Sequence, residues 1–252
     1  MSGASLAGKR ILVTGASAGI GRATAHALSR AGAQLVLVAR DEARLKAVHA
    51  ELDGSGHTWI SLDLAQRHAE LPQVLKQLAE SGVFYGFVHA AGVNLSAPIK
   101  MQQWARAEAM MALNWGAGLM LAKAFRQQGV CCKTGGRAIF ISSSASLVGD
   151  KALAAYAASK GAVNAMARAL AVEWAPERIT VNVVAPGFIQ TELNQQLLTR
   201  LTEEQVRALE QRHPLGLGTP EDVASVILFL MGAEARWITG AVIPVDGGLT
   251  AF

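Results

Sequence analysis

The chain has 252 residues, a length that allows one large domain or two small ones. Only 17% of the residues are charged, the net charge is +4, and mean hydropathy is +0.28, so much apolar surface is buried within or between chains. The basic residues are scattered, which argues against nucleic-acid binding. We expect no membrane contact and a cytoplasmic location, because no run is long enough to span a bilayer and the N-terminus lacks a signal-peptide core.

Short apolar runs alternate with helical patterns along the whole chain, with no linker between two halves. Continuous β-branched runs of this kind are typical of strands covered on both faces, so the chain predicts a single α/β domain over 1–252 with a Rossmann-type, doubly wound parallel sheet of about seven strands. The expected strands are 10–14, 34–39, 58–62, 84–90, 137–142, 179–185 and 241–245. The expected helices are 19–31, 41–53, 66–81, 101–128, 150–175 and 219–232.

A glycine-rich turn follows the first predicted strand. The sequence TGASAGIG at 14–21 places Gly15, Gly19 and Gly21 between that strand and the next predicted helix. Glycines allow a tight turn and a close backbone approach to a diphosphate, and the helix N-terminus presents unpaired N–H groups to it. This context predicts a dinucleotide-binding turn.

The end of the second predicted strand indicates which dinucleotide is bound. The strand ends in Ala39, where a carboxylate would repel a ribose 2′-phosphate, and Arg40 follows it. An arginine can grip a phosphate through charge-assisted hydrogen bonds, so NADP is preferred over NAD. The next residue, Asp41, is better placed to begin the following helix. A plain surface arginine is the alternative interpretation of Arg40.

Two cysteines, Cys131 and Cys132, are adjacent and lack the Cys/His spacing of a metal site, so we interpret them as free thiols. The fifth strand ends in a serine run. There Ser143 could hold a substrate carbonyl, while Ser142 and Ser144 are interpreted as turn and cap residues.

Tyr156 and Lys160 lie four residues apart on a predicted helix and share one face. A nearby ammonium lowers the pKa of a phenol, so this pair could exchange a proton with an alcohol or carbonyl oxygen. Alone the pattern is weak, but the serine run and the glycine turn favour chemistry. The polar, helix-prone stretch 190–215 is a candidate lid over the site, and apolar residues in and near the lid favour a partly apolar ligand: Leu95, Phe188, Leu193, Leu197 and Leu198.

Together these motifs resemble the short-chain dehydrogenase/reductase family over essentially the whole chain. The further matching pieces are Asp63-Leu64, HAAG at 89–92, Asn114, YAASK at 156–160, VNVVAPGFIQTEL at 181–193 and VIPVDGG at 242–248. The segment VVAPGFIQTEL is similar to that of 3-oxoacyl-acyl-carrier-protein reductases.

The resemblance implies a role for each matching residue. Tyr156 is the general acid/base, Lys160 lowers its pKa and bonds the nicotinamide ribose, Ser143 orients the substrate oxygen, and Asn114 interrupts its helix and holds a water that connects Lys160 to solvent. The implied cofactor-binding residues are Gly15, Ser17, Gly19, Ile20, Gly21, Arg40, Asp63, Leu64, Ala90, Gly92, Tyr156, Lys160, Pro186, Gly187, Ile189 and Thr191. Relatives are usually homotetramers, joined through the long fourth and fifth helices and the last strand.

Two positions depart from the family pattern. His89 stands where the family most often has Asn, and we expect a hydrogen-bonded core histidine, with a pH-sensitive group near the cofactor as the alternative. Val172 stands where the acyl-carrier-protein reductases carry a basic residue that meets the carrier. Arg137 and Lys133 could supply part of such a docking patch, so a carrier-protein partner is possible but not favoured.

The leading hypothesis is an NADPH-dependent oxidoreductase that reduces a carbonyl to a secondary alcohol, similar to a 3-oxoacyl-thioester reductase. A sugar, sterol, polyol or small ketone is the alternative small-molecule substrate. A dinucleotide-binding regulator without catalysis is the hypothesis from another class, because fold does not fix function.

Overall fold

The computed structural model describes residues 5–133, 135–199 and 201–251, without the side chains of Leu193, Gln196 and Leu197. Its seven strands are β1 (Arg10–Thr14), β2 (Gln34–Ala39), β3 (Thr58–Ser61), β4 (Gly86–His89), β5 (Arg137–Ile141), β6 (Thr180–Pro186) and β7 (Val242–Val245). They form one all-parallel sheet in the order β3-β2-β1-β4-β5-β6-β7. The predicted Rossmann-type parallel sheet in one domain is confirmed.

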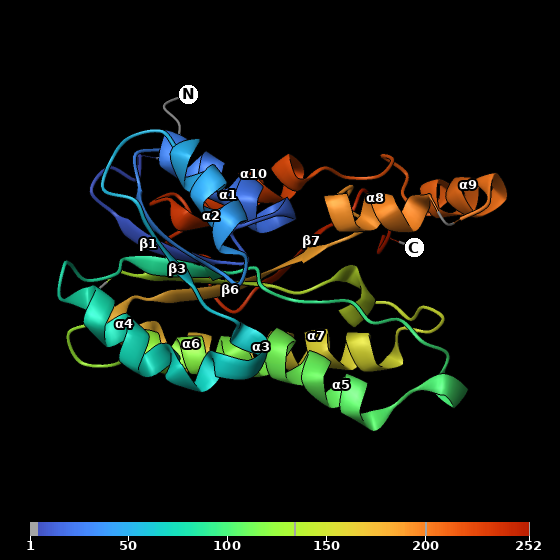
Figure 1. Cartoon of the computed structure of the whole chain (residues 1–252), viewed down its shortest axis with the longest axis horizontal. Coiled ribbons are helices and arrows are strands. Elements are labelled where there is room, and N and C mark those ends of the chain that lie inside the picture. The colour runs from blue at the N-terminus through green and yellow to red at the C-terminus, as the bar shows by residue number, and fades with distance from the viewer. Residues whose placement is uncertain (1–4, 134, 200, 252) are drawn as a thin grey trace.

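Helices cover both faces of the sheet (Figure 1). One face carries α1 (Gly19–Arg30), α2 (Glu42–Ala50) and α10 (Pro220–Met231), and the other carries α4 (Leu71–Ala79), α6 (Ala117–Phe125) and α7 (Ala154–Trp174). Successive strand residues alternate between these two layers, so Leu12 packs with one hydrophobic cluster while Ile11 and Val13 pack with the other. Continuous apolar strands result because each face has its own helical cover.

The observed helices differ from the predicted ones mainly because two of the predicted helices are interrupted and form shorter helices. The expected helix 66–81 is divided into α3 (Leu64–Arg67) and α4, whose first turn contains Pro72. The expected helix 101–128 is divided into α5 (Trp104–Met111), a π-helical turn (Ala112–Gly116) and α6. The stretch 190–215 forms α8 (Glu192–Leu198) and α9 (Glu203–Gln211), with Arg200 outside the described residues.

The order of the strands in the sheet predicts where a ligand-binding cleft lies. The chain builds outward from β1 to β3 and then returns to β4 on the other side of β1, so the two directions of winding separate between β1 and β4. In open α/β sheets ligands bind outside the carboxyl ends of the strands at such a point. In Figure 1, α8 and α9 lie beyond one end of the sheet, on the side of α1 and α10.

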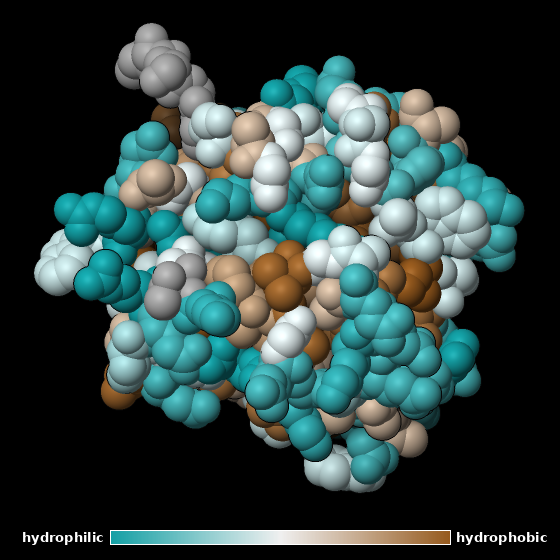
Figure 2. Space-filling model, turned by 90° about the vertical axis from the view of Figure 1, so that its left-hand side faces the viewer, coloured by the Kyte–Doolittle hydropathy of each residue, from teal (hydrophilic) through white to brown (hydrophobic). Residues whose placement is uncertain are grey.

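Figure 2 shows the end of the molecule on the left of Figure 1, the side away from α8 and α9. Hydrophilic residues cover most of this face, and apolar side chains gather only in limited patches between them. Among the described residues, no helix combines the length and the apolar character needed to cross a bilayer.

Candidate active site

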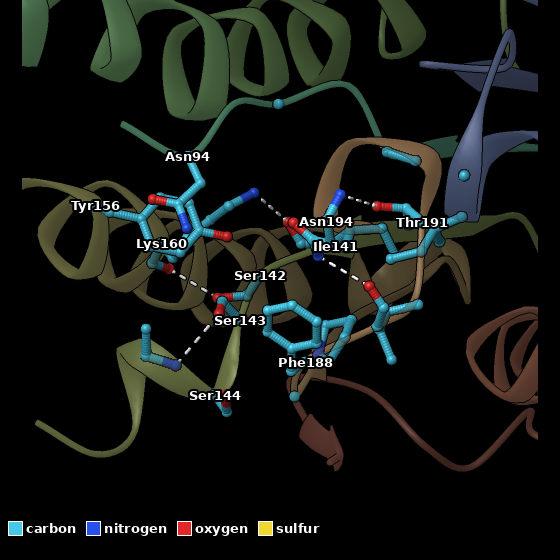
Figure 3. Close-up of a pocket in the computed structure, with 18 of the residues that line it drawn as sticks. Asn94, Ile141, Ser142, Ser143, Ser144, Tyr156, Lys160, Phe188, Thr191 and Asn194 are labelled. Carbon is cyan, nitrogen blue, oxygen red and sulfur yellow. Dashed lines mark hydrogen bonds between the residues drawn. The ribbon is translucent and has the colours of Figure 1, made fainter. Parts of the chain in front are cut away.

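A cavity of about 570 Å³ lies at the carboxyl ends of the strands. Figure 3 shows how side chains from several elements converge on it, with Tyr156 and Lys160 beside Asn94 and, across the space, Thr191 and Asn194. Most of the predicted site residues line it: Gly15, Gly19, Ile20, Gly21, Ala90, Gly92, Ser143, Tyr156, Lys160, Pro186, Gly187, Ile189 and Thr191. Ser17, Arg40, Asp63, Leu64 and Asn114 are not among its lining residues.

The glycine turn forms the wall of the cavity next to β1. Gly15 has a φ of +67°, and a Cβ added there would lie 2.8 Å from the backbone N of Ala91. The neighbouring helix α1 begins at Gly19, has no acidic residue in its first turn, and its N-cap Ala18 makes no side-chain hydrogen bond. An uncapped helix N-terminus behind a glycine-rich turn fits the diphosphate of a dinucleotide.

The turn also contacts the residue that precedes α8. A Cβ at Gly19 would lie 3.0 Å from Cγ2 of Thr191, immediately before α8. Thr191 is therefore close to the site proposed for the diphosphate, and any side chain at residue 19 would push the two walls apart. Ser17 lies within the same turn, half-buried, outside the lining.

Near the end of β2, the arginine that lines the cavity is not the one that the sequence predicted. Arg40 is exposed and does not line the cavity, whereas Arg44, one turn into α2, does. Arg44 Nη1 lies 3.0 Å from Oε2 of Glu192 in α8, so this arginine joins α2 to α8. Asp41 is the N-cap of α2 and accepts from Arg44 N at 3.0 Å, as predicted. The sequence carried no signal for Arg44, because its partner is 148 residues away.

Asp63 and Leu64 follow β3. The Asp63 carboxylate accepts a hydrogen bond from Ala65 N at 2.9 Å and caps α3, while the side chain of Leu64 is buried in the core. These two residues therefore have structural partners of their own, and their predicted place beside an adenine stays a prediction.

Tyr156 and Lys160 lie one turn apart on α7, with Lys160 Nζ 5.9 Å from the centre of the Tyr156 ring. Burial raises the pKa of the Tyr156 phenol, and the neighbouring Ser143 side chain lowers it by less. The net direction is opposite to the expected lowering by Lys160. Tyr156 is half-buried, and a phenol with a raised pKa stays protonated at neutral pH, a state in which it can donate a proton.

Lys160 is buried, and its ammonium group donates to the carbonyl oxygen of Ile141 at the end of β5, 2.9 Å away. Burial lowers the pKa of Lys160 to about 8. A Cβ at Gly92 would lie 3.2 Å from Lys160 Nζ, so glycine at that position keeps the space between the lysine and β4 open.

Asn114 lies in the π-helical turn between α5 and α6, and its side chain is fully buried. Its Oδ1 accepts from Val93 N at 2.8 Å, and its Nδ2 donates to Val93 O at 3.0 Å and to Ser159 Oγ at 2.9 Å. The helix is therefore interrupted at Asn114, and its amide joins the strand β4 loop to α7. Single π-helical turns of this kind recur at functional sites.

His89 is buried at the end of β4, where Nδ1 shares a 2.9 Å hydrogen bond with Oγ1 of Thr14. Burial and then the charge of Lys160 lower the pKa of His89 to about 3. A Cβ at Gly118 would lie 3.2 Å from the ring, so this glycine makes room for it. The ring is neutral throughout the physiological range, which agrees with a core histidine and not with a pH-sensitive group. The predicted hydrogen bonding holds for Nδ1 only, because Nε2 is buried without a partner among the described residues.

The segment that ends α9 contacts the body of the molecule through a second ion pair. Arg212, just after α9, lies 2.8 Å from Asp150 in the loop before α7, and both residues line the cavity. Of the apolar residues expected near the ligand, Phe188 lines the cavity, whereas Leu95 and Leu198 do not. The side chains of Leu193 and Leu197 lie outside the described residues.

Of the two residues predicted to supply part of a docking patch, Arg137 cannot do so because it is buried, and the contribution of Lys133 stays a prediction. Arg137 is the first residue of β5 and is buried, with its guanidinium donating to the carbonyl oxygens of Gly135, Gly136 and Gly232. Lys133 is exposed in the loop just before β5. Both lie at the amino end of that strand, whereas the cavity lies at the carboxyl ends. Cys131 and Cys132 are free thiols in the same loop, as expected.

Comparison with known proteins finds oxidoreductases that are similar to this chain over nearly its whole length. A family model described as enoyl-(acyl carrier protein) reductase matches residues 15–250. The chain is 35% identical to a 3-oxoacyl-(acyl-carrier-protein) reductase of Vibrio cholerae, covering 97% of this chain and 98% of that one. It is 34% identical to a glucose 1-dehydrogenase of Gluconobacter oxydans, covering 98% and 93%.

Solved structures agree with these matches. A provisionally assigned NAD(P)-dependent gluconate 5-dehydrogenase of Beutenbergia cavernae, with NADP bound at low occupancy, has a TM-score of 0.91, 35% identity and coverage of 98% and 99%. A short-chain dehydrogenase/reductase of Serratia marcescens has a TM-score of 0.89, 30% identity and coverage of 97% and 99%.

Proposed function

Because the chain belongs to the short-chain dehydrogenase/reductase family, we propose that it is an NADPH-dependent enzyme that reduces a carbonyl group to a secondary alcohol. Family membership carries the general activity, oxidoreduction between carbonyl and CH–OH groups. The observation that supports the direction is the Ser143–Tyr156–Lys160 group on the same cavity as the glycine turn, with a phenol that burial keeps protonated.

The roles of the residues follow from their chemistry. Bound NADPH supplies the hydride. Tyr156 donates its phenolic proton to the substrate oxygen, and the Ser143 hydroxyl holds that oxygen in place by a hydrogen bond. Lys160 lines the cavity and is proposed to bond the nicotinamide ribose. Asn114 holds the loop at Val93 and the helix at Ser159. Pro186, Gly187, Ile189 and Thr191 hold the carboxamide in this scheme.

The substrate is proposed to be a small or medium carbonyl compound of mixed polarity. Apolar Phe188, Leu209 and Leu249 line the cavity together with polar Asn94 and Asn194. A 3-oxoacyl thioester fits this lining, and a sugar, sterol or small ketone is the alternative. A carrier-protein partner is not favoured, since Val172 is exposed on α7 in place of a basic residue.

A substrate panel tests the proposed function. The protein is incubated with NADPH and, in separate reactions, with 3-oxoacyl thioesters, keto sugars and simple ketones, and NADPH oxidation is followed. Consumption of NADPH with at least one member, and formation of the matching alcohol, is expected. A protein that binds NADPH but oxidises none of it over the whole panel would instead be a non-catalytic binding module.

Arg40→Ala is expected to raise the Kd for NADPH by about tenfold or more and to leave the Kd for NADH unchanged, because a charge-assisted phosphate contact is lost. Fluorescence titration measures both constants. Arg30→Ala, which removes an exposed arginine at the end of α1, is the matched control. Equal loss for both cofactors would contradict the 2′-phosphate contact. Arg44→Ala in the same titration decides whether the cavity-lining arginine, rather than Arg40, carries the preference.

We propose a homotetramer joined through α5–α7 and the last strand. Support comes from apolar side chains exposed on these parts of the chain: Trp104 is 79% exposed on α5, Val172 78% on α7, and Trp237, before β7, 88%. Sedimentation velocity is expected to give a tetramer, and Val172→Glu a smaller species. A wild-type protein that stays monomeric at micromolar concentration would refute this assembly.

A further inference from the structure

His213 is a buried histidine that the proposed chemistry does not use. It follows the last turn of α9, is 3% exposed, and lines the cavity on the lid side. Both of its ring nitrogens have backbone partners. Phe188 N donates to Nε2 at 3.1 Å, and Nδ1 lies 2.8 Å from the carbonyl oxygen of Leu209.

These partners determine where the ring proton lies. A backbone N–H can only donate, so Nε2 must carry a lone pair toward Phe188. A neutral imidazole then carries its hydrogen on Nδ1, where the carbonyl oxygen of Leu209 accepts it. The ring therefore accepts one hydrogen bond at Nε2 and donates one at Nδ1. The two bonds depend on the same tautomer, which has its hydrogen on Nδ1.

The two bonds join segments that are distant in sequence. Leu209 belongs to the lid helix α9, whereas Phe188 follows β6 in the loop that borders the cavity floor. The ring also packs tightly on that loop, because a Cβ added at Gly187 would lie 3.1 Å from Nε2 of His213. The same Cβ would lie 2.9 Å from the Cα of Asp246 on the other side. Gly187 must lack a side chain for the ring to sit there.

The rest of the loop is held by backbone bonds on either side. Gly187 N donates to Val245 O at 3.0 Å, and Gly218 N donates to Phe188 O at 3.1 Å. The Phe188 N–H lies between these two contacts, and His213 is the acceptor that the described residues provide for it. Without an acceptor, this part-buried N–H would favour a rotation of the Gly187–Phe188 peptide toward water.

We propose that His213 is a positioning residue that couples the lid helix α9 to the nicotinamide end of the cavity by holding the Gly187–Phe188 peptide in its binding shape. The inference rests on the proposed function, in which Pro186, Gly187, Ile189 and Thr191 hold the carboxamide. His213 touches neither substrate nor cofactor in this role. It acts through the loop, and its effect belongs to the nicotinamide half of the dinucleotide.

Two substitutions and two ligands test this role. His213→Leu keeps similar bulk and removes both polar atoms. His213→Gln keeps one acceptor and one donor separated by a single carbon, as in the imidazole. NADPH reports on the whole site, and 2′-phospho-ADP-ribose, which lacks only the nicotinamide ring, reports on the site without the nicotinamide contacts.

His213→Leu is expected to raise the Kd for NADPH by about tenfold, since the Phe188 N–H loses its acceptor, and to leave that for 2′-phospho-ADP-ribose unchanged. His213→Gln is expected to recover most of the NADPH affinity. Hydrogen exchange of peptides 187–190 and 203–211 should speed up together in the Leu variant, while exchange of β1 and α1 stays as in the wild type.

A Leu variant with wild-type NADPH affinity overturns the inference, as does an equal loss for both ligands, which would mark a general structural defect. If the Leu variant does not fold, His213→Asn takes its place, because its shorter amide cannot reach both partners at once. Wild-type protein that binds no dinucleotide overturns the proposed function as well. If it binds NADH in preference, the same comparison is made with NADH and ADP-ribose.

Discussion

Tyr156→Phe is expected to lower kcat for carbonyl reduction by about three orders of magnitude and to leave the Kd for NADPH nearly unchanged. The substitution removes one oxygen atom and keeps the ring that packs in the cavity. What is lost is the proton donor beside Ser143, the side chain that lowers the pKa of the phenol. Steady-state kinetics with the best substrate of the panel, together with NADPH titration, measure the two effects separately.

The chain offers a matched control, because it has only one other tyrosine. Tyr85 lies before β4 and its hydroxyl donates to the carbonyl oxygen of Met231, on the α10 side of the sheet and outside the cavity lining. Tyr85→Phe should cost about 1 kcal/mol of stability through the lost hydrogen bond and leave kcat unchanged. Full activity of Tyr156→Phe would rule out the phenol as the proton donor, whatever the control does.

Lys160→Met is expected to lower kcat/KM by about a hundredfold or more and, at the same time, to make the folded chain more stable at pH 7. Burial lowers the pKa of Lys160 to about 8 from its ordinary value of 10.5, so the charged lysine is unfavourable in the folded state. Methionine fills a similar space without the charge. The lost hydrogen bond to Ile141 O offsets part of the gain.

The pH dependence of the stability difference between Lys160→Met and the wild type identifies its cause. Between about pH 8 and 10.5 the unfolded chain holds the Lys160 proton and the folded chain releases it, so wild-type stability rises with pH in that window. The advantage of the Met variant should be about 2 kcal/mol near pH 7 and should shrink toward pH 10.5. Urea unfolding at both pH values measures it, with Lys76→Met on the exposed face of α4 as the control.

An advantage of Lys160→Met that did not change with pH would mean that packing, and not the buried charge, causes it. A variant with full activity would remove Lys160 from the proposed site. The opposite signs for activity and stability are the distinguishing feature, because a residue that only supports the fold loses both when it is replaced.

Much of the fold could be predicted because the relevant forces act locally. Continuous apolar runs such as 34–39 form strands wherever both faces are covered, and the glycines at 15, 19 and 21 are needed by the turn itself. The four-residue spacing of Tyr156 and Lys160 is a property of any helix, and the structure places both on the cavity. The position of Asp41 as a helix cap also follows from its neighbours alone.

The features that could not be predicted from the residues alone depend on contacts between segments that are distant in sequence. The residues 112–116 have an ordinary helical sequence, and only the family resemblance pointed to the interruption that the bonds of Asn114 to Val93 and Ser159 accompany. Arg137 is an unremarkable basic residue in the sequence, but the sheet buries it at the end away from the cavity. Arg44 and His213 gain their partners only in the tertiary structure, which brings Glu192 to Arg44 and the Phe188 N–H to His213.

The residues of this chain by themselves determined a parallel α/β domain, a dinucleotide-binding turn and a tyrosine–lysine pair, since each follows from periodicity or spacing within one element. The tertiary structure alone decided the state of that pair. A phenol beside an ammonium is expected to acidify, yet the pKa of Tyr156 rises and that of Lys160 falls. Burial of both groups has the larger effect, and burial arises only when strands and helices from the whole chain close around them.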